Sequence, residues 1–183
     1  MARPSDRECG DCSVCCVVAE IPDLKKPARE RCQYQIDSDT GGCSIVGDPR
    51  RPLMCERFYC SWMRGIGSEG DKPNKVNAMF SVNRTERGLI GYCVETVDGA
   101  VLTTARDMTI EYATTYKIPL VVVAVTDPDE DLGEIVVHTD IEEKAQAILG
   151  EHVADLSDDV RMFKRKLPEW PSQSQPQAQT SKD

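Results

Sequence analysis

Hydrophobic residues in the C-terminal part of the chain are spaced as in strands. Two runs rich in β-branched and aromatic residues, 78–82 and 89–96, flank the polar segment 83–88 and predict a β-hairpin. The nearly continuous apolar run 120–126 predicts a strand that is covered on both faces. A shorter run, 134–138, predicts a further strand. Together these runs predict a small mixed sheet.

Helical spacing follows the predicted hairpin and the last predicted strand. Thr104 and Asp107 open a helical stretch that Pro119 ends. Its apolar positions share one face: Ala105, Met108, Tyr112 and Tyr116. We expect this helix to lie on the sheet. Thr139 and Glu142 form a capping box that predicts a second helix. The inward stripe of that second helix is Ile141, Ala145, Ile148 and Leu149.

Charge order predicts a final helix near the C-terminus. Ser157, Asp158 and Asp159 would lie at its positive N-terminus, and the basic run 164–166 at its negative C-terminus. The last segment, 168–183, is rich in Pro, Gln and Ser and is expected to be disordered.

The N-terminal part has a different composition, because proline and glycine interrupt it repeatedly and eight of the nine cysteines lie in the first 60 residues. We therefore expect residues 1–65 to form an eight-cysteine metal-binding module, 66–73 a linker, 74–167 an α+β domain and 168–183 a tail. The predicted fold class is α+β: a loop-rich, metal-stapled N-terminal cysteine module followed by a small mixed-sheet α+β domain.

Charge and hydropathy exclude several partners. The formal net charge of -9 argues against nucleic acid, since no extended basic surface is available for phosphates. The longest apolar stretch, 120–125, is far shorter than the roughly 20 residues needed to cross a bilayer, so we expect no membrane partner. The N-terminus lacks the apolar core of an export signal, which predicts a cytoplasmic protein. In that reducing compartment, clustered cysteines are better interpreted as metal thiolates than as disulfides.

The spacing of the first cysteines is that of metal ligands. Cys9, Cys12 and Cys15 follow one another at intervals of three, so a chain turn can aim all three sulfurs at one ion. Cys16 is adjacent to Cys15 and therefore points elsewhere, toward a second metal or as a bridge between two. Four more cysteines complete the set. The predicted metal ligands are Cys9, Cys12, Cys15, Cys16, Cys32, Cys43, Cys55 and Cys60.

The segment around the last two cysteines leaves two questions open. On one continuous helix, the side chains of Cys55 and Cys60 would differ in direction by about 140°, so either the helix breaks between them or each serves a different centre. Phe58, Tyr59 and Trp62 would shield the thiolates from water, or they are ordinary core aromatics. Nearby arginines would offset the negative charge of metal thiolates. These are Arg50, Arg51, Arg57 and Arg64.

The metal itself is either zinc or iron. Eight cysteines divide into two sets of four, which is what two structural Zn2+ sites require. Three cysteines separated by two-residue spacers, with a fourth far along the chain, are also the usual ligands of a [4Fe-4S] cluster. The Cys-Pro ending of bacterial ferredoxins is missing here. The ninth cysteine, Cys93, lies in a predicted strand and is expected to be a buried structural thiol.

The cysteines and their neighbours carry a family resemblance over residues 9–64. The matching motifs are Cys9-x2-Cys12-x2-Cys15-Cys16, then Cys32, Gly42-Cys43-Ser44-Ile45, Arg51-Pro52-x2-Cys55 and Phe58-x-Cys60-x-Trp62. This pattern resembles the YkgJ-type cysteine cluster family, described as a zinc- or iron-chelating domain with eight shared cysteines. A related cluster in flagellin lysine N-methylase connects the resemblance with iron-sulfur chemistry, but this chain has no convincing nucleotide or S-adenosylmethionine loop.

Three functions are consistent with these observations. The first is a metal-binding protein that holds zinc or iron through the eight thiolates, with the metal mainly structural. The second is an iron-sulfur redox protein or enzyme related to flagellin lysine N-methylase. The third is a protein-interaction module with an unidentified protein partner. No residue is assigned a catalytic role.

Overall fold

The computed structural model describes residues 5–36, 41–85, 88–125, 132–145 and 149–166. The strands are β1 (Ala78–Thr85), β2 (Gly88–Glu95), β3 (Leu120–Val123), β4 (Leu132–His138), β5 (Glu151–Ser157) and β6 (Val160–Lys166). The α-helices are α1 (Val14–Val18), α2 (Leu53–Arg57), α3 (Pro73–Val76), α4 (Arg106–Thr115) and α5 (Thr139–Ala145). Short 3-10 turns are η1 (Pro22–Leu24), η2 (Trp62–Arg64), η3 (Glu69–Asp71) and η4 (Ala100–Leu102).

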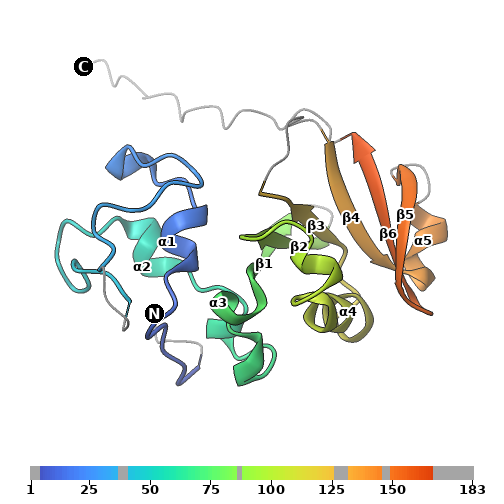
Figure 1. Ribbon diagram of the computed structural model, residues 1–183, viewed down its shortest axis with the longest axis horizontal. Helices are drawn as coiled ribbons and strands as arrows, with labels where there is room; N and C mark the ends of the chain where they lie inside the picture. The colour runs from blue at the N-terminus through green and yellow to red at the C-terminus, as the bar shows by residue number, and fades with distance from the viewer. Residues whose placement is uncertain (1–4, 37–40, 86–87, 126–131, 146–148, 167–183) are drawn as a thin grey trace, which may run out of the picture.

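Within these residues the strands form a six-stranded sheet in the order β1-β2-β3-β4-β6-β5. The β2–β3 pair is parallel and the other pairs are antiparallel, so the sheet is mixed and the fold class is α+β, as predicted. Figure 1 shows α4 packed against the sheet, with α1 and α2 beyond β1 at the opposite end of the molecule from β5.

The predicted hairpin is confirmed and is longer than the sequence indicated. β1 pairs with β2 along their whole length, from Ala78 opposite Glu95 to Thr85 opposite Gly88. The added residues are polar and exposed, which is why their sequence resembled a loop. Hydrogen bonding to the partner strand keeps them in the sheet although they bury little apolar surface.

The predicted helix on the sheet is α4, and its inward face is largely as expected. Met108 and Tyr112 are buried, and the ring of Tyr112 stacks on Phe80 with 5.2 Å between centroids. Tyr116, expected on the same inward face, follows the end of the helix and is 40% exposed. Thr109 is buried instead and donates a hydrogen bond from Oγ1 to the Ala105 carbonyl oxygen.

The predicted final helix is wrong, because residues 157–166 belong to the β5–β6 hairpin. Val160 and Met162 are buried at the two-residue spacing of a strand, whereas Arg161 between them pairs with Asp155. Charge order alone suits a helix, but alternate burial against β4 favours the strand.

The other helices and strands predicted from the sequence agree in part with those of the structure. The strand predicted over 120–126 is β3, in which Leu120, Val121 and Val122 are buried while Val123 is 39% exposed. The shorter predicted strand is β4, and the second predicted helix is α5, which begins at Thr139. Ile141 and Leu149 pack on a cluster centred on Val121 and Phe163. The predicted inward residue Ile148 and the predicted tail, 168–183, lie outside the described residues.

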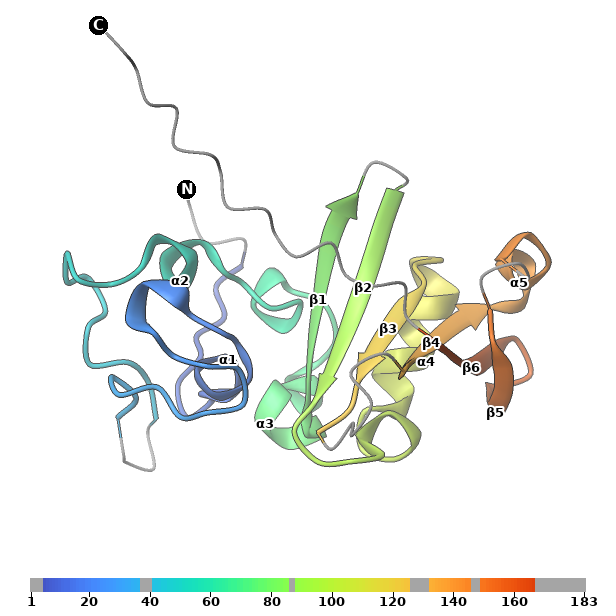
Figure 2. The same cartoon turned by 90° about the horizontal axis from the view of Figure 1, so that it is seen from above.

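The cysteine-rich part of the chain packs on the face of the sheet opposite α4. Met79 and Val94, which pair across β1 and β2, contact Val18, Trp62 and Met63. The backbone N–H of Ser61 donates to the Phe80 carbonyl oxygen at 2.8 Å. Figure 2 shows these segments alongside β1, so they cover this edge strand of the sheet.

Arg29 forms a second link between the cysteine-rich part and the sheet. Its guanidinium donates to the carbonyl oxygens of Glu95, at the end of β2, and of Ala124, just after β3. The carboxylate of Glu95 is buried and accepts from the backbone N–H of Val101 at 2.7 Å. These bonds hold residues around position 29 against one end of the sheet.

No helix in the described part of the chain is both long and apolar enough to cross a bilayer.

The stacking of Phe80 on Tyr112 provides a test of the fold. Phe80→Ala removes a buried ring from between β1 and α4 and should lower the free energy of unfolding by about 3 kcal/mol. Leu89→Ala in the exposed part of β2 is the matched control and should change stability by well under about 1 kcal/mol. Urea unfolding followed by circular dichroism measures both, and equal losses would contradict this packing.

Candidate metal centre

A tight turn and a short helix position the first four cysteines. The backbone N–H of Cys12 donates to the Cys9 carbonyl oxygen at 2.9 Å, which closes a turn between them. Cys15 and Cys16 lie in α1, where consecutive side chains differ in direction by about 100°. The adjacent side chains thereby leave the helix in different directions: Cys15 lines both hollows described below, whereas Cys16 lines only the larger one.

A bridge between two loops positions Cys32 and Cys43. Gln35 and Cys43 pair as an isolated antiparallel bridge, and the backbone N–H of Ser44 donates to the Tyr34 carbonyl oxygen at 2.9 Å. Gly41 has φ of 58°, and a Cβ there would lie 2.7 Å from the Asp11 carbonyl oxygen. A glycine is required at this position because the loop that precedes Cys43 approaches the first cysteine turn so closely.

Helix α2 ends between the last two cysteines. Cys55 lies inside α2, whereas Phe58 already has an extended backbone and Cys60 lies on the approach to β1. Cys60 is buried beside Trp62 and Met79. The break anticipated between Cys55 and Cys60 is therefore present, and it directs the two thiols to different places.

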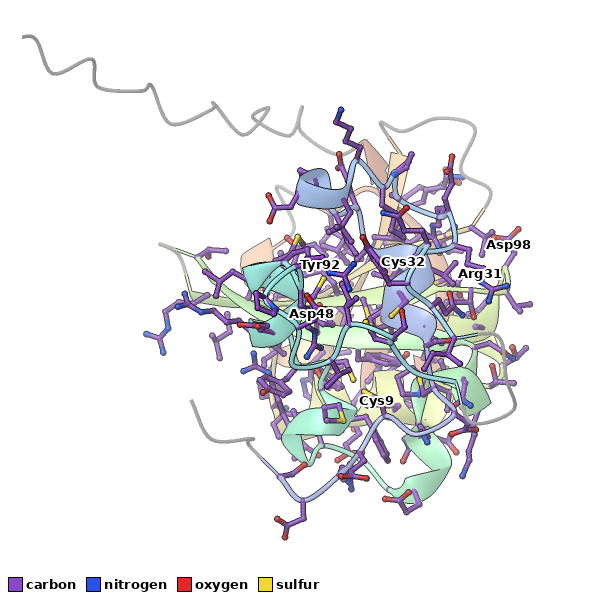
Figure 3. The ribbon with its side chains drawn as sticks, turned by 90° about the vertical axis from the view of Figure 1, so that its left-hand side faces the viewer. Cys9, Arg31, Cys32, Asp48, Tyr92 and Asp98 are labelled. Atoms are coloured by element: carbon purple, nitrogen blue, oxygen red, sulfur yellow. The ribbon has the colours of Figure 1, made fainter. Side chains whose placement is uncertain are left out.

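Two adjoining hollows lie among these cysteines. The small hollow has a volume of about 10 Å³, and its cysteines are Cys9, Cys12, Cys15 and Cys60. The large hollow has a volume of about 120 Å³, and its cysteines are Cys9, Cys15, Cys16, Cys32, Cys43 and Cys55. Figure 3 shows this face, with Cys9 and Cys32 labelled and sulfur atoms visible around and between them.

The electrostatic neighbours of the thiols fall mostly within two groups of four, and the contact of Cys15 with Cys16 joins the two groups. Cys9 interacts most strongly with Cys12 and Cys60, and Cys15 with Cys16, Cys9 and Cys12. Cys55 interacts instead with Cys16, Cys32 and Cys43. Together with the lining of the hollows, these interactions define a first group and a second group of thiols. The first group is Cys9, Cys12, Cys15 and Cys60, and the second group is Cys16, Cys32, Cys43 and Cys55.

Burial and mutual proximity hold most of these thiols in the protonated form. Desolvation is the main cause that raises the pKa of Cys12, Cys55 and Cys60. It also raises the pKa of Cys9, whose thiol is desolvated among neighbouring sulfurs although the residue as a whole is exposed. Neighbouring thiolates raise it further, because like charges repel.

The adjacent pair in α1 behaves differently. The hydrogen bond from the Cys15 thiol lowers the pKa of Cys16 to about 7 and raises that of Cys15 well above its ordinary value. Arg51 and Lys26 also favour the Cys16 thiolate. The second group therefore contains the thiol that ionises most easily among those whose pKa is shifted.

Three cations lie close to the thiols, and the sequence singled out only one of them. Arg51 favours the thiolate of Cys16 and opposes the rise that desolvation causes in the pKa of Cys55, as expected for an offsetting charge. Lys72 acts in the same sense on Cys9 and Cys12. The other arginines that the sequence singled out have other surroundings. Arg50 pairs with Asp48, and Arg64 donates to the Tyr59 carbonyl oxygen. Arg57 is exposed.

Lys26, the third cation, was missed because a lysine between a leucine-containing turn and a proline resembles a solvated loop residue. Its side chain is buried, and Nζ donates to three backbone carbonyl oxygens, those of Val17 at 3.0 Å, Ala19 at 2.5 Å and Pro27 at 2.8 Å. These bonds tie the C-terminal end of α1 to the loop that precedes Cys32. Lys26 therefore both positions the second group and faces it with positive charge.

The aromatic residues near the last two cysteines lie in the core or around the hollows, and the shielding of the thiolates stays a prediction. Trp62 is buried in the cluster with Met63 and Met79, and it also lines the small hollow. Phe58 is 39% exposed and lines the large hollow. The Arg7 guanidinium lies 5.0 Å from the Trp62 ring centroid, in reach of a cation–π contact.

The eight predicted ligands surround the two hollows, and the ninth cysteine does not. Cys93 is fully buried in the main core, where desolvation raises its pKa, in agreement with a structural thiol. All nine cysteines are free. Among the described residues, no group of three or more cysteine, histidine, aspartate or glutamate side chains is arranged to hold a metal ion as it stands. Coordination requires the sulfurs to move into the hollows they line.

Comparisons with known proteins give no match: no family model, no curated protein and no solved structure matches the chain.

The role of Lys26 is testable without assuming a metal. Lys26→Met leaves three buried carbonyl oxygens without their donor and should lower the free energy of unfolding by about 2 kcal/mol. The neighbouring variant Lys25→Met is the control, because Lys25 is exposed and keeps its side chain in solvent. Thermal unfolding of both variants decides the matter, and a Lys26→Met protein as stable as the control would refute this account of the loop.

Proposed function

We propose that this is a metal-binding protein that holds zinc or iron through eight cysteine thiolates, and that the metal is mainly structural. The main observation in support is that eight cysteines, which are spread over positions 9 to 60 of the chain, line two adjoining hollows, while the ninth lies elsewhere. The proposed ligands are Cys9, Cys12, Cys15, Cys16, Cys32, Cys43, Cys55 and Cys60. We also propose that the chain belongs with the YkgJ-type cysteine cluster proteins that its motifs resemble.

The donor set suits a soft or borderline metal. Eight sulfurs with no histidine among them favour Zn2+ or iron over magnesium or calcium, which prefer oxygen. Raised pKa values mean that most of these thiols would lose their protons only as the metal binds. Metal binding would then be steeply pH-dependent and would release protons.

Cations beside the thiols support the proposal on electrostatic grounds. Four thiolates around a dication leave a site with a charge of about -2, and two such sites add their charges. Arg51 and Lys26 face the second group, and Lys72 faces the first. In a protein of net charge -9, these basic residues would offset part of the negative charge of metal thiolates.

A structural role follows from how little else holds the cysteine-rich part together. Helices α1 and α2 have five residues each, too short to be stable alone. The buried cluster that the cysteine-rich part forms with Met79 is small, and several of the large apolar side chains in this part, such as Val46 and Leu53, are exposed. Metal bonds would supply the cross-links that apolar burial does not. A reducing compartment such as the cytoplasm would keep the thiols available.

Metal content is the direct test. The untagged full chain, purified without oxygen, should contain at least about one metal ion for each group of four thiols, as zinc, iron or both. Zinc, iron and acid-labile sulfide are measured per chain together with the visible spectrum. A folded protein without stoichiometric metal, even after anaerobic reconstitution with zinc or with iron and sulfide, would overturn the proposal.

Metal removal tests the structural role separately. Chelation at neutral pH should expose residues 9–64 to proteolysis first, whereas the β1–β6 sheet should resist longer because its main core contains none of the eight proposed ligands. Cleavage sites are mapped by mass spectrometry at equal protease concentration. Unchanged circular dichroism and protease resistance in a verified metal-free sample would argue against a structural metal.

A further inference from the structure

We infer that the two groups of thiols hold different occupants: a single tetrahedral ion such as Zn2+ in the small hollow, and a [4Fe-4S] cluster in the large one. This inference rests on the proposed function, since it assigns occupants to the same eight cysteines. It makes Cys9, Cys12, Cys15 and Cys60 the ligands of the ion, and Cys16, Cys32, Cys43 and Cys55 the ligands of the cluster.

Size is the first argument. A volume of about 10 Å³ holds one water-sized body, so the small hollow has room for a single ion. The large hollow, at about 120 Å³, is an order of magnitude larger and has room for a polynuclear core. The difference arises because Trp62, Met63 and Met79 close the small hollow from the side of the sheet, whereas the large hollow lies between loops.

An unpaired donor at the large hollow is the second argument. Arg51 lines this hollow, and its Nη2 donates to the Cys55 carbonyl oxygen at 3.0 Å. Its Nε is buried and has no hydrogen-bond partner among the described residues. A buried unpaired N–H costs free energy. Sulfide or thiolate sulfur of a cluster would accept from it, and hydrogen bonds to cluster sulfur are a main determinant of reduction potential.

The covering of the large hollow is the third argument. Apart from the cysteines its lining is mainly apolar, with Ile45, Met54 and Phe58 among the residues around it. An apolar shell keeps water and oxidants from a cluster, which a closed zinc site needs less. Met54 and Phe58 are partly exposed, so the occupant would lie close to the surface.

The assignment differs from what the ferredoxin-like triplet indicates. Cys9, Cys12 and Cys15 have the spacing of cluster ligands, but they lie with Cys60 around the small hollow. The cluster ligands come instead from α1, from two loops and from α2. Cys9 and Cys15 also border the large hollow, so the two centres would be neighbours.

Paired cysteine variants of the full chain test the assignment. The unmodified protein, prepared anaerobically and reconstituted with zinc, iron and sulfide, should hold about one zinc and about four iron and four sulfide. Cys12→Ser with Cys60→Ser should lose the zinc and keep the iron and visible absorption. Cys32→Ser with Cys43→Ser should lose the iron, the sulfide and the absorption and keep the zinc.

The outcomes separate this inference from the proposed function. Two zinc ions and no iron, or loss of the same metal from both paired variants, would overturn the inference and leave the metal-binding proposal standing. A protein that binds neither metal would overturn both.

Arg51 gives a test that does not depend on removing a ligand. Arg51→Gln should lower the reduction potential of the cluster at unchanged iron content, because a positive charge and the Nε–H donor are lost beside it. Arg57→Gln, at the C-terminal end of α2 and exposed, is the matched control and should leave the potential unchanged. A redox titration followed by visible absorption compares them, and equal potentials in both variants would contradict a cluster in the large hollow even if the serine variants fail to fold.

Discussion

The structure depends on how eight crowded thiols are kept from repelling one another. Desolvation and neighbouring sulfurs raise the pKa of most of them, so without metal they persist largely as neutral thiols. Cys16, which accepts a hydrogen bond from Cys15 and faces Arg51 and Lys26, has its pKa lowered to about 7 and is poised to ionise near neutral pH. A metal would reverse this balance, since it replaces several protons with one cation and draws the sulfurs inward.

The sheet provides the rigid surface on which this chemistry is arranged. Met79 and Val94 support the cysteine-rich part from one face, while α4 covers the opposite face through Tyr112 and Phe80. The small hollow therefore has a firm wall that belongs to the sheet, whereas the large hollow is bounded by loops and by the short helices α1 and α2. Because the sheet does not line the large hollow, its shape depends more on what it contains.

The sequence predicted much of the sheet and the identity of the candidate ligands, because strand periodicity and cysteine spacing are local signals. It failed where burial decided between two local options, as at Val160 and Met162, whose charged neighbours favoured a helix. Division of the ligands into groups could not be predicted, since it depends on the end of α2 and on how closely the loop at Gly41 approaches Asp11. Lys26 was missed because its three carbonyl acceptors come from separate turns.

X-ray absorption at the zinc and iron edges of the anaerobically purified full chain tests the central claim, coordination by cysteine sulfur, most directly. The account predicts a first shell of sulfur alone, at about 2.3 Å from zinc, with sulfur ligands and short iron-iron contacts where iron is bound. A first shell dominated by oxygen or nitrogen around stoichiometric metal would contradict it, because the eight thiols around the two hollows would then not be the ligands.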